Sequence, residues 1–118
     1  MNNLEEFYTS VGADSAEVIR RLGGNPTLIL RFLAMFREDS SFKELCTAFD
    51  SNNTEAAFRA AHKLKGVSGT LGFQRLFDKA SAVTELLRAG NLTEALVARP
   101  ALEKEYELVL EALKSIDL

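Results

Sequence analysis

The chain has 118 residues, a formal net charge of −3, and 47% hydrophobic and 26% charged residues. This length suits one domain, residues 1–118, with a single core, and the composition is that of an ordinary globular protein. The acidic balance argues against a nucleic-acid binder, which would usually show a basic face. The single Cys46 cannot form an internal disulfide, and Cys46 with His62 gives too few ligands for a zinc site.

No segment predicts a membrane span or a secretion signal. The longest apolar stretch, Leu28 to Phe36, is interrupted by Arg31 and is much shorter than a span. The first residues include Glu5 and Glu6 and do not have the pattern of a signal peptide. We therefore expect a cytoplasmic protein that binds no membrane.

Every periodic segment has helical spacing, and no stretch alternates like a strand. Six helices are expected, at about Leu4 to Thr9, Asp14 to Leu22, Asn25 to Asp50, Asn52 to Leu71, Phe73 to Leu87 and Asn91 to Ile116. Gly23-Gly24, Gly72 and Gly90 follow helix ends, as glycine often does. Asn52 with Glu55 resembles a capping box, and Pro100 is expected to kink or restart the last helix.

The third predicted helix changes its apolar face partway. Ile29, Phe32, Leu33 and Phe36 share one face, whereas Phe42, Leu45, Cys46 and Phe49 share another. Either the helix kinks near Asp39-Ser40-Ser41, or its two halves bury different sides; the sequence leaves both open. Long helices joined by short loops pack antiparallel. The predicted fold is therefore all-α, an antiparallel four-helix bundle with two short N-terminal helices at one end.

The only histidine, His62, is predicted to face away from the core. At about 100° per residue, the apolar residues of its helix fall between about 140° and 220° from His62; these are Ala57, Ala60, Leu64, Val67 and Leu71. The residues within about 60° of His62 are mainly polar or small; these are Phe58, Arg59, Lys65, Gly66 and Gly69. Because a glycine inside a helix costs about 1 kcal/mol relative to alanine, Gly66 and Gly69 suggest that something must approach this face closely.

A neutral imidazole is a good nucleophile for phosphorus. Lys65 lies about one turn beyond His62 and could bring an ammonium group near the oxygens of a phosphohistidine. Each feature alone has an ordinary interpretation, because surface histidines and solvated lysines are common. Their conjunction on one helix face favours phosphoryl transfer.

The segment Ala61-His62-Lys63-Leu64-Lys65-Gly66, followed by small residues and Leu71-Gly72, resembles the signature of the histidine-containing phosphotransfer (HPt) domain. Further positions that fit are Leu22-Gly23-Gly24, Phe36, Asp39, Leu45, Ala48, Leu76, Leu86 and Gly90. The resemblance implies that His62 is the phosphoacceptor and that Lys65 stabilises the phosphate. It also implies that Gly66 leaves room for a receiver domain. Val67 and the pair Gly69-Thr70 depart mildly from the family pattern.

The family implies a phosphorelay intermediate in a two-component system, with receiver domains of response regulators or a hybrid histidine kinase as partners. Around His62, we expect Phe58, Arg59, Lys63 and Gly69 to form the partner-binding surface. No nucleotide-binding loop is present in the sequence, so we expect no ATP-dependent kinase activity. We expect no cofactor or metal of the chain's own, with magnesium held only by the receiver, and a monomer.

Two other classes of function remain open. The chain could be a helical adaptor with an unphosphorylated histidine, although His62 and Lys65 are both present. It could also be an acid–base enzyme, which would need a second polar group in a pocket.

Overall fold

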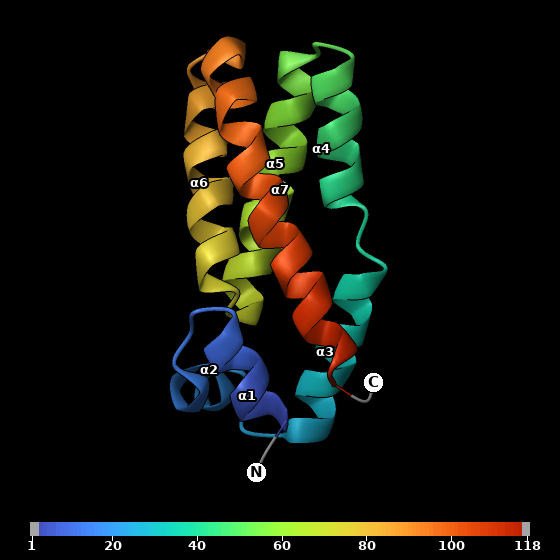
Figure 1. The fold of residues 1–118 in the computed structure, drawn as a ribbon, viewed down its shortest axis with the longest axis vertical. Helices are drawn as coiled ribbons and strands as arrows, with labels where there is room; N and C mark the ends of the chain where they lie inside the picture. Colours follow the sequence, from blue (N-terminus) through green and yellow to red (C-terminus); the bar gives the residue numbers. More distant parts are fainter. Residues whose placement is uncertain (1–2, 117–118) are drawn as a thin grey trace.

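The computed structural model describes residues 3–116, which form seven α-helices and no strand (Figure 1). The helices are α1 (Asn3–Ser10), α2 (Ser15–Arg21), α3 (Pro26–Arg37), α4 (Ser41–Asp50), α5 (Thr54–Leu71), α6 (Gln74–Arg88) and α7 (Leu92–Lys114). The predicted all-α class is confirmed. The structure has one helix more than the sequence predicted, because the expected third helix is two helices.

Helices α4 to α7 form the bundle, and α1 and α2 lie together at the end where α5 finishes and α6 begins (Figure 1). Helix α5 packs between α4 and α6, and α6 also packs on α7. The molecule as a whole is elongated, with principal extents of 44 × 22 × 21 Å. The predicted arrangement of four helices with two short ones at one end is therefore confirmed for the described residues.

The prediction of one helix from Asn25 to Asp50 is wrong, although the change of face was placed at the right residues. Helix α3 ends at Arg37 and α4 begins at Ser41. Between them, the Asp39 carboxylate accepts a hydrogen bond from the Ser41 backbone N–H at 2.9 Å and a second from the Ser41 hydroxyl. This local capping competes with helix continuation. Each helix can then turn its own apolar face to the core.

The predicted cap of α5 is displaced by one residue. Asn53, not Asn52, has the extended backbone of an N-cap, and its side chain accepts from the Ala56 backbone N–H at 3.0 Å. Asn52 instead takes a left-handed conformation with φ 53°, which asparagine tolerates better than most residues. Glu55 serves no capping box, because the Asn53 backbone N–H donates to the Ala48 carbonyl at 2.9 Å, and the Glu55 carboxylate pairs with Arg59 at 2.9 Å.

Helix α7 runs through Pro100 without ending, so the expected restart does not occur. Pro100 is exposed, and a row of buried residues on α7 begins two residues later, at Leu102. The apolar residues that follow at helical spacing lie on the core side: Leu102, Val109, Leu113 and Ile116 are buried, and Tyr106 is partly buried. This row closes the core of the bundle.

An aromatic cluster fixes the end of α5 to the N-terminal helices. Phe73 lies between the Gly72 cap of α5 and the start of α6, and it packs edge-on against Phe7 and Phe36, with ring centroids 5.7 and 4.9 Å away. Gly72 caps α5 with φ 82°, and a Cβ there would lie 2.7 Å from a methyl group of Val18 on α2. The C-terminal end of α5 therefore lies close against α2.

Candidate functional site

His62 lies in the middle of α5 and is exposed to solvent. Its neighbours Ala61 and Leu64 are fully buried, as are Ala57, Ala60 and Leu71. The predicted outward direction of the histidine is confirmed, and the buried face of α5 is the one that the helical wheel indicated. Two details differ: Val67 is only partly buried, and the wheel did not place Ala61 and Ser68 on the core face, although both are buried.

Seven residues line an open depression at His62: Arg21, His62, Lys65, Gly66, Gly69, Thr70 and Phe77. Lys65 is half-buried and Gly66 is exposed. Two of the seven are cations and none is a carboxylate. In a chain with a net charge of −3, the surface beside the imidazole is therefore locally positive. Such a surface favours an anionic group.

The two glycines of this face have different surroundings. A Cβ on Gly66 would meet nothing within 4 Å, so the space above it is open. A Cβ on Gly69 would lie 2.8 Å from Cδ1 of Phe77 on α6. The expectation that Gly69 extends the clearance for a partner is therefore corrected: its missing side chain lets α6 approach α5.

Gly66 also borders a second hollow, between the C-terminal end of α3 and α5. Its lining is largely apolar and consists of Phe32, Met35, Phe36, Asp39, Gly66, Val67, Thr70 and Leu71. Met35 is 63% exposed, which is unusual for a large apolar side chain. We call this hollow the α3–α5 groove. Gly66 and Thr70 line both the groove and the depression at His62, so the two form one continuous surface.

The other expected partner-binding residues lie around His62 on α5. Phe58 is half-buried, and its ring stacks on the His62 imidazole, with centroids 6.0 Å apart and planes 20° apart. Arg59 is exposed and paired with Glu55 of its own helix. Lys63 is exposed and reaches toward α4, where its Nζ lies 3.2 Å from Oε1 of Glu44.

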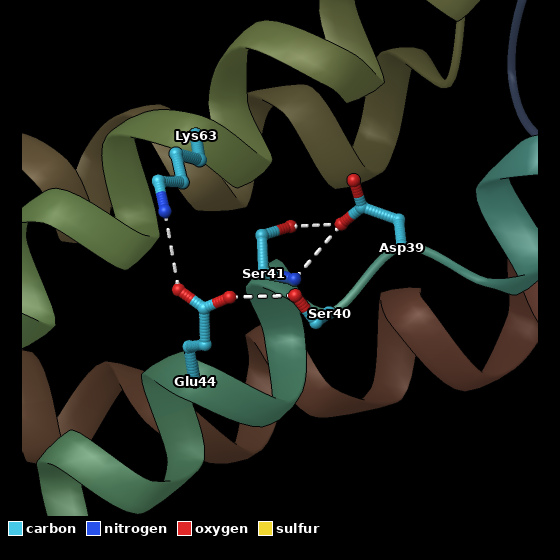
Figure 2. A network of polar contacts seen from close by, with 5 residues as sticks. All are labelled: Asp39, Ser40, Ser41, Glu44 and Lys63. Carbon is cyan, nitrogen blue, oxygen red and sulfur yellow. Dashed lines mark hydrogen bonds and ion pairs between the residues drawn. The ribbon is translucent and has the colours of Figure 1, made fainter.

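Figure 2 shows how Lys63 is tied to the α3–α4 junction. The other carboxylate oxygen of Glu44 accepts a hydrogen bond from the Ser40 hydroxyl at 2.6 Å. The hydrogen bond from Ser40, and next the contact with Lys63, hold the pKa of Glu44 below its usual value. At pH 7 this carboxylate is ionised, and it holds the Lys63 ammonium beside α4.

Sequence reasoning missed four residues beside the site. Arg21 at the end of α2 donates weakly to the backbone oxygens of Thr70 and Gly69, at 3.4 and 3.5 Å. The others lie on α6 and are Phe77, Glu85 and Arg88. The hydrogen bond from Arg88 lowers the pKa of Glu85, and the positive charges of Arg88 and Lys65 act in the same direction. Only the folded arrangement of α2, α5 and α6 brings these residues together.

Among residues 3–116, no three His, Cys, Asp or Glu side chains are grouped so as to hold a metal ion. The same residues include no helix that is long and apolar enough to cross a membrane. The expectations of no metal, no cofactor and a cytoplasmic location remain predictions.

A protein-family model described as the Hpt domain matches residues 28–114. The match covers most of the chain, including α4, α5 and α6 in full, and the chain therefore belongs to the Hpt domain family, which is a family of two-component phosphorelays. No curated protein and no solved structure matches the chain significantly.

Proposed function

We propose that the chain is a phosphorelay intermediate. His62 accepts a phosphoryl group from the phosphoaspartate of one receiver domain and passes it to the aspartate of another. The observation that carries this proposal is the exposed imidazole in the middle of α5, beside a glycine with nothing within 4 Å of its Cβ position. Membership of the Hpt domain family supports the same chemistry.

The transfer is a single displacement at phosphorus. The lone pair of one ring nitrogen of His62 attacks the phosphorus atom, a P–N bond forms, and the P–O bond to the aspartate breaks. The bonding electrons leave with the aspartate carboxylate, and the proton on the other ring nitrogen stays in place. Charge is conserved, because the ring becomes cationic as the carboxylate leaves. The second receiver reverses these steps.

Positive charge beside the ring suits this reaction. A phosphoryl group on His62 adds anionic oxygens, and Lys65 lies one turn along the same face of α5. Arg21 lines the same depression from α2. Phosphoryl transfer depends mainly on positioning and electrostatics, which these cations and the exposed ring would provide.

The partner would cover both hollows that meet at Gly66. The α3–α5 groove offers apolar surface with the exposed Met35, and the depression at His62 offers cations. Such an interface has an apolar part and a positively charged part. The positive part would match the acidic site of a receiver domain. The magnesium ion that such transfer needs would come with the receiver. We further propose that the chain has no kinase activity of its own and works as a cytoplasmic monomer.

The test is phosphotransfer with purified receiver domains of the source organism, each charged by a small-molecule phosphodonor. At least one receiver should label the wild-type chain and not His62→Gln. The labelled chain, once freed of that receiver, should pass its phosphate to a receiver and lose its label. A wild-type chain that no receiver labels would contradict the proposal and favour a non-phosphorylated adaptor.

A further inference from the structure

The His62 side chain has few restraints of its own. Within residues 3–116, its imidazole makes no hydrogen bond and no ion pair, and its one ring contact is with Phe58. An exposed ring without a polar partner would rotate readily about its side-chain bonds. Transfer in line requires the attacking nitrogen to point at phosphorus, so the orientation of this ring matters for the rate.

Phe58 is placed to restrain the ring. It lies one turn before His62 on the same face of α5, and the two rings stack nearly parallel, with centroids 6.0 Å apart. This distance is within the range of favourable aromatic pairs. Phe58 is half-buried and packs against the core, so the fold fixes its own ring.

Helix α6 holds Phe58 from a second direction. The guanidinium carbon of Arg88 lies over the Phe58 ring, 4.9 Å from its centroid, which is a cation–π contact. Arg88 is anchored in turn by Glu85, whose Oε2 lies 2.8 Å from Arg88 Nε. A chain of three contacts therefore runs from Glu85 through Arg88 and Phe58 to the imidazole.

We propose that Phe58 is a positioning residue for phosphoryl transfer, and that Arg88, anchored by Glu85, holds the Phe58 ring against the His62 imidazole. This inference rests on the proposed function. The contact sets the direction of the nucleophilic nitrogen, a role separate from any contact that Phe58 makes with the receiver. Its loss lowers the maximal transfer rate at saturating receiver.

The test compares Phe58→Leu, Phe58→Tyr and Arg88→Gln with wild type. Single-turnover transfer from a phosphorylated receiver is measured over a range of receiver concentrations. The imidazole carbon-bound protons are followed by NMR, where one set of signals belongs to the only histidine. The matched control is Phe42→Leu, which removes an aromatic ring that stacks on Tyr106 between α4 and α7. Thermal melting shows that each variant is folded.

Phe58→Leu should lower the maximal rate at saturating receiver about 3- to 10-fold. Its imidazole signals should move toward those of free histidine, because the ring current of Phe58 is lost. Phe58→Tyr should restore both quantities, Arg88→Gln should give a smaller change of the same kind, and Phe42→Leu should give none.

A Phe58→Leu variant with the wild-type maximal rate overturns the inference, whether or not its imidazole signals move. A fall in rate that comes only from weaker receiver binding also overturns it. A wild-type chain that no receiver can phosphorylate overturns the proposed function, and with it this inference. The two failures are thus distinguished by the wild-type reaction.

Discussion

Gly66 and Gly69 lie about one turn apart on α5, yet only Gly69 faces another helix. A Cβ on Gly69 would lie 2.8 Å from the Phe77 ring, whereas a Cβ on Gly66 would have nothing within 4 Å. Gly69 allows α5 and α6 to pack closely, and Gly66 keeps the surface beside His62 free of side chains. The two positions therefore have different effects on stability and on transfer.

Alanine at the two positions should change stability in opposite directions. Gly66→Ala should raise the free energy of unfolding by up to about 1 kcal/mol, because alanine has the better helix propensity and meets no neighbour. Gly69→Ala gains the same propensity but forces the Phe77 ring to move, and overpacking costs about 1 to 3 kcal/mol. Urea unfolding of both variants measures the difference. Equal stability of the two variants would show that the Phe77 ring moves aside at little cost in free energy.

A larger side chain at Gly66 should impair transfer without unfolding the protein. Gly66→Gln would place its amide between the depression at His62 and the α3–α5 groove, where the receiver must approach. Transfer should slow at least tenfold, which corresponds to about 1.4 kcal/mol in the barrier. The melting temperature should stay near or above that of wild type. If Gly66→Gln transfers phosphate at the wild-type rate, the receiver does not need the open space at Gly66.

Lys65 should act on the phosphorylated state through its charge. Lys65→Ala should slow transfer or shorten the half-life of the phosphohistidine, and Lys65→Arg should retain part of the function because the charge survives. Lys65 keeps part of its surface in solvent, so the effect should be modest and should shrink at high salt. Half-lives and rates at low and high salt give the comparison. If alanine matches wild type in both at low salt, Lys65 has no part in the site.

Tyr8 should make the protein sensitive to alkali. Its buried hydroxyl has no hydrogen-bond partner among the described residues, and burial raises its pKa to about 12. The folded protein holds the phenol proton more tightly than the unfolded chain, whose tyrosine titrates near 10. The free energy of unfolding should therefore be constant with respect to this group below pH 10 and fall between pH 10 and 12, by at most about 2.7 kcal/mol.

The control is Tyr8→Phe, measured by denaturant unfolding over the same pH range. At pH 7 it should be as stable as wild type or more stable, because it removes a buried hydroxyl that lacks a partner. Its alkaline loss should be smaller than that of wild type. Identical pH profiles for the two proteins would show that the hydroxyl is solvated in the folded state.

The part of the site on one helix could be predicted from the sequence. The fixed angle per residue placed His62, Lys65 and Gly66 on the outer face of α5. The change of face near Asp39 was visible as well. Its cause, a side-chain cap on Ser41, was not, because Asp and Ser can also occur within a helix.

Contacts between helices could not be predicted in this way. The wheel placed Gly69 beside His62, but it carries no information about the Phe77 ring of α6 that occupies the space. Arg21 and Arg88 are far from His62 in sequence, and both had the pattern of ordinary solvated cations. Their roles depend on how α2 and α6 pack on α5, which one sequence does not give.

The central claim is that His62 carries the phosphoryl group, and direct mapping of the phosphorylated residue tests it most directly. The chain is phosphorylated by a phosphorylated receiver. The phosphate on the chain is then located by fragment mass spectrometry under alkaline conditions, where phosphohistidine survives. The account predicts one acid-labile phosphate per chain, on His62, and none on His62→Gln. Phosphate on any other residue, or equal labelling of His62→Gln, would contradict it.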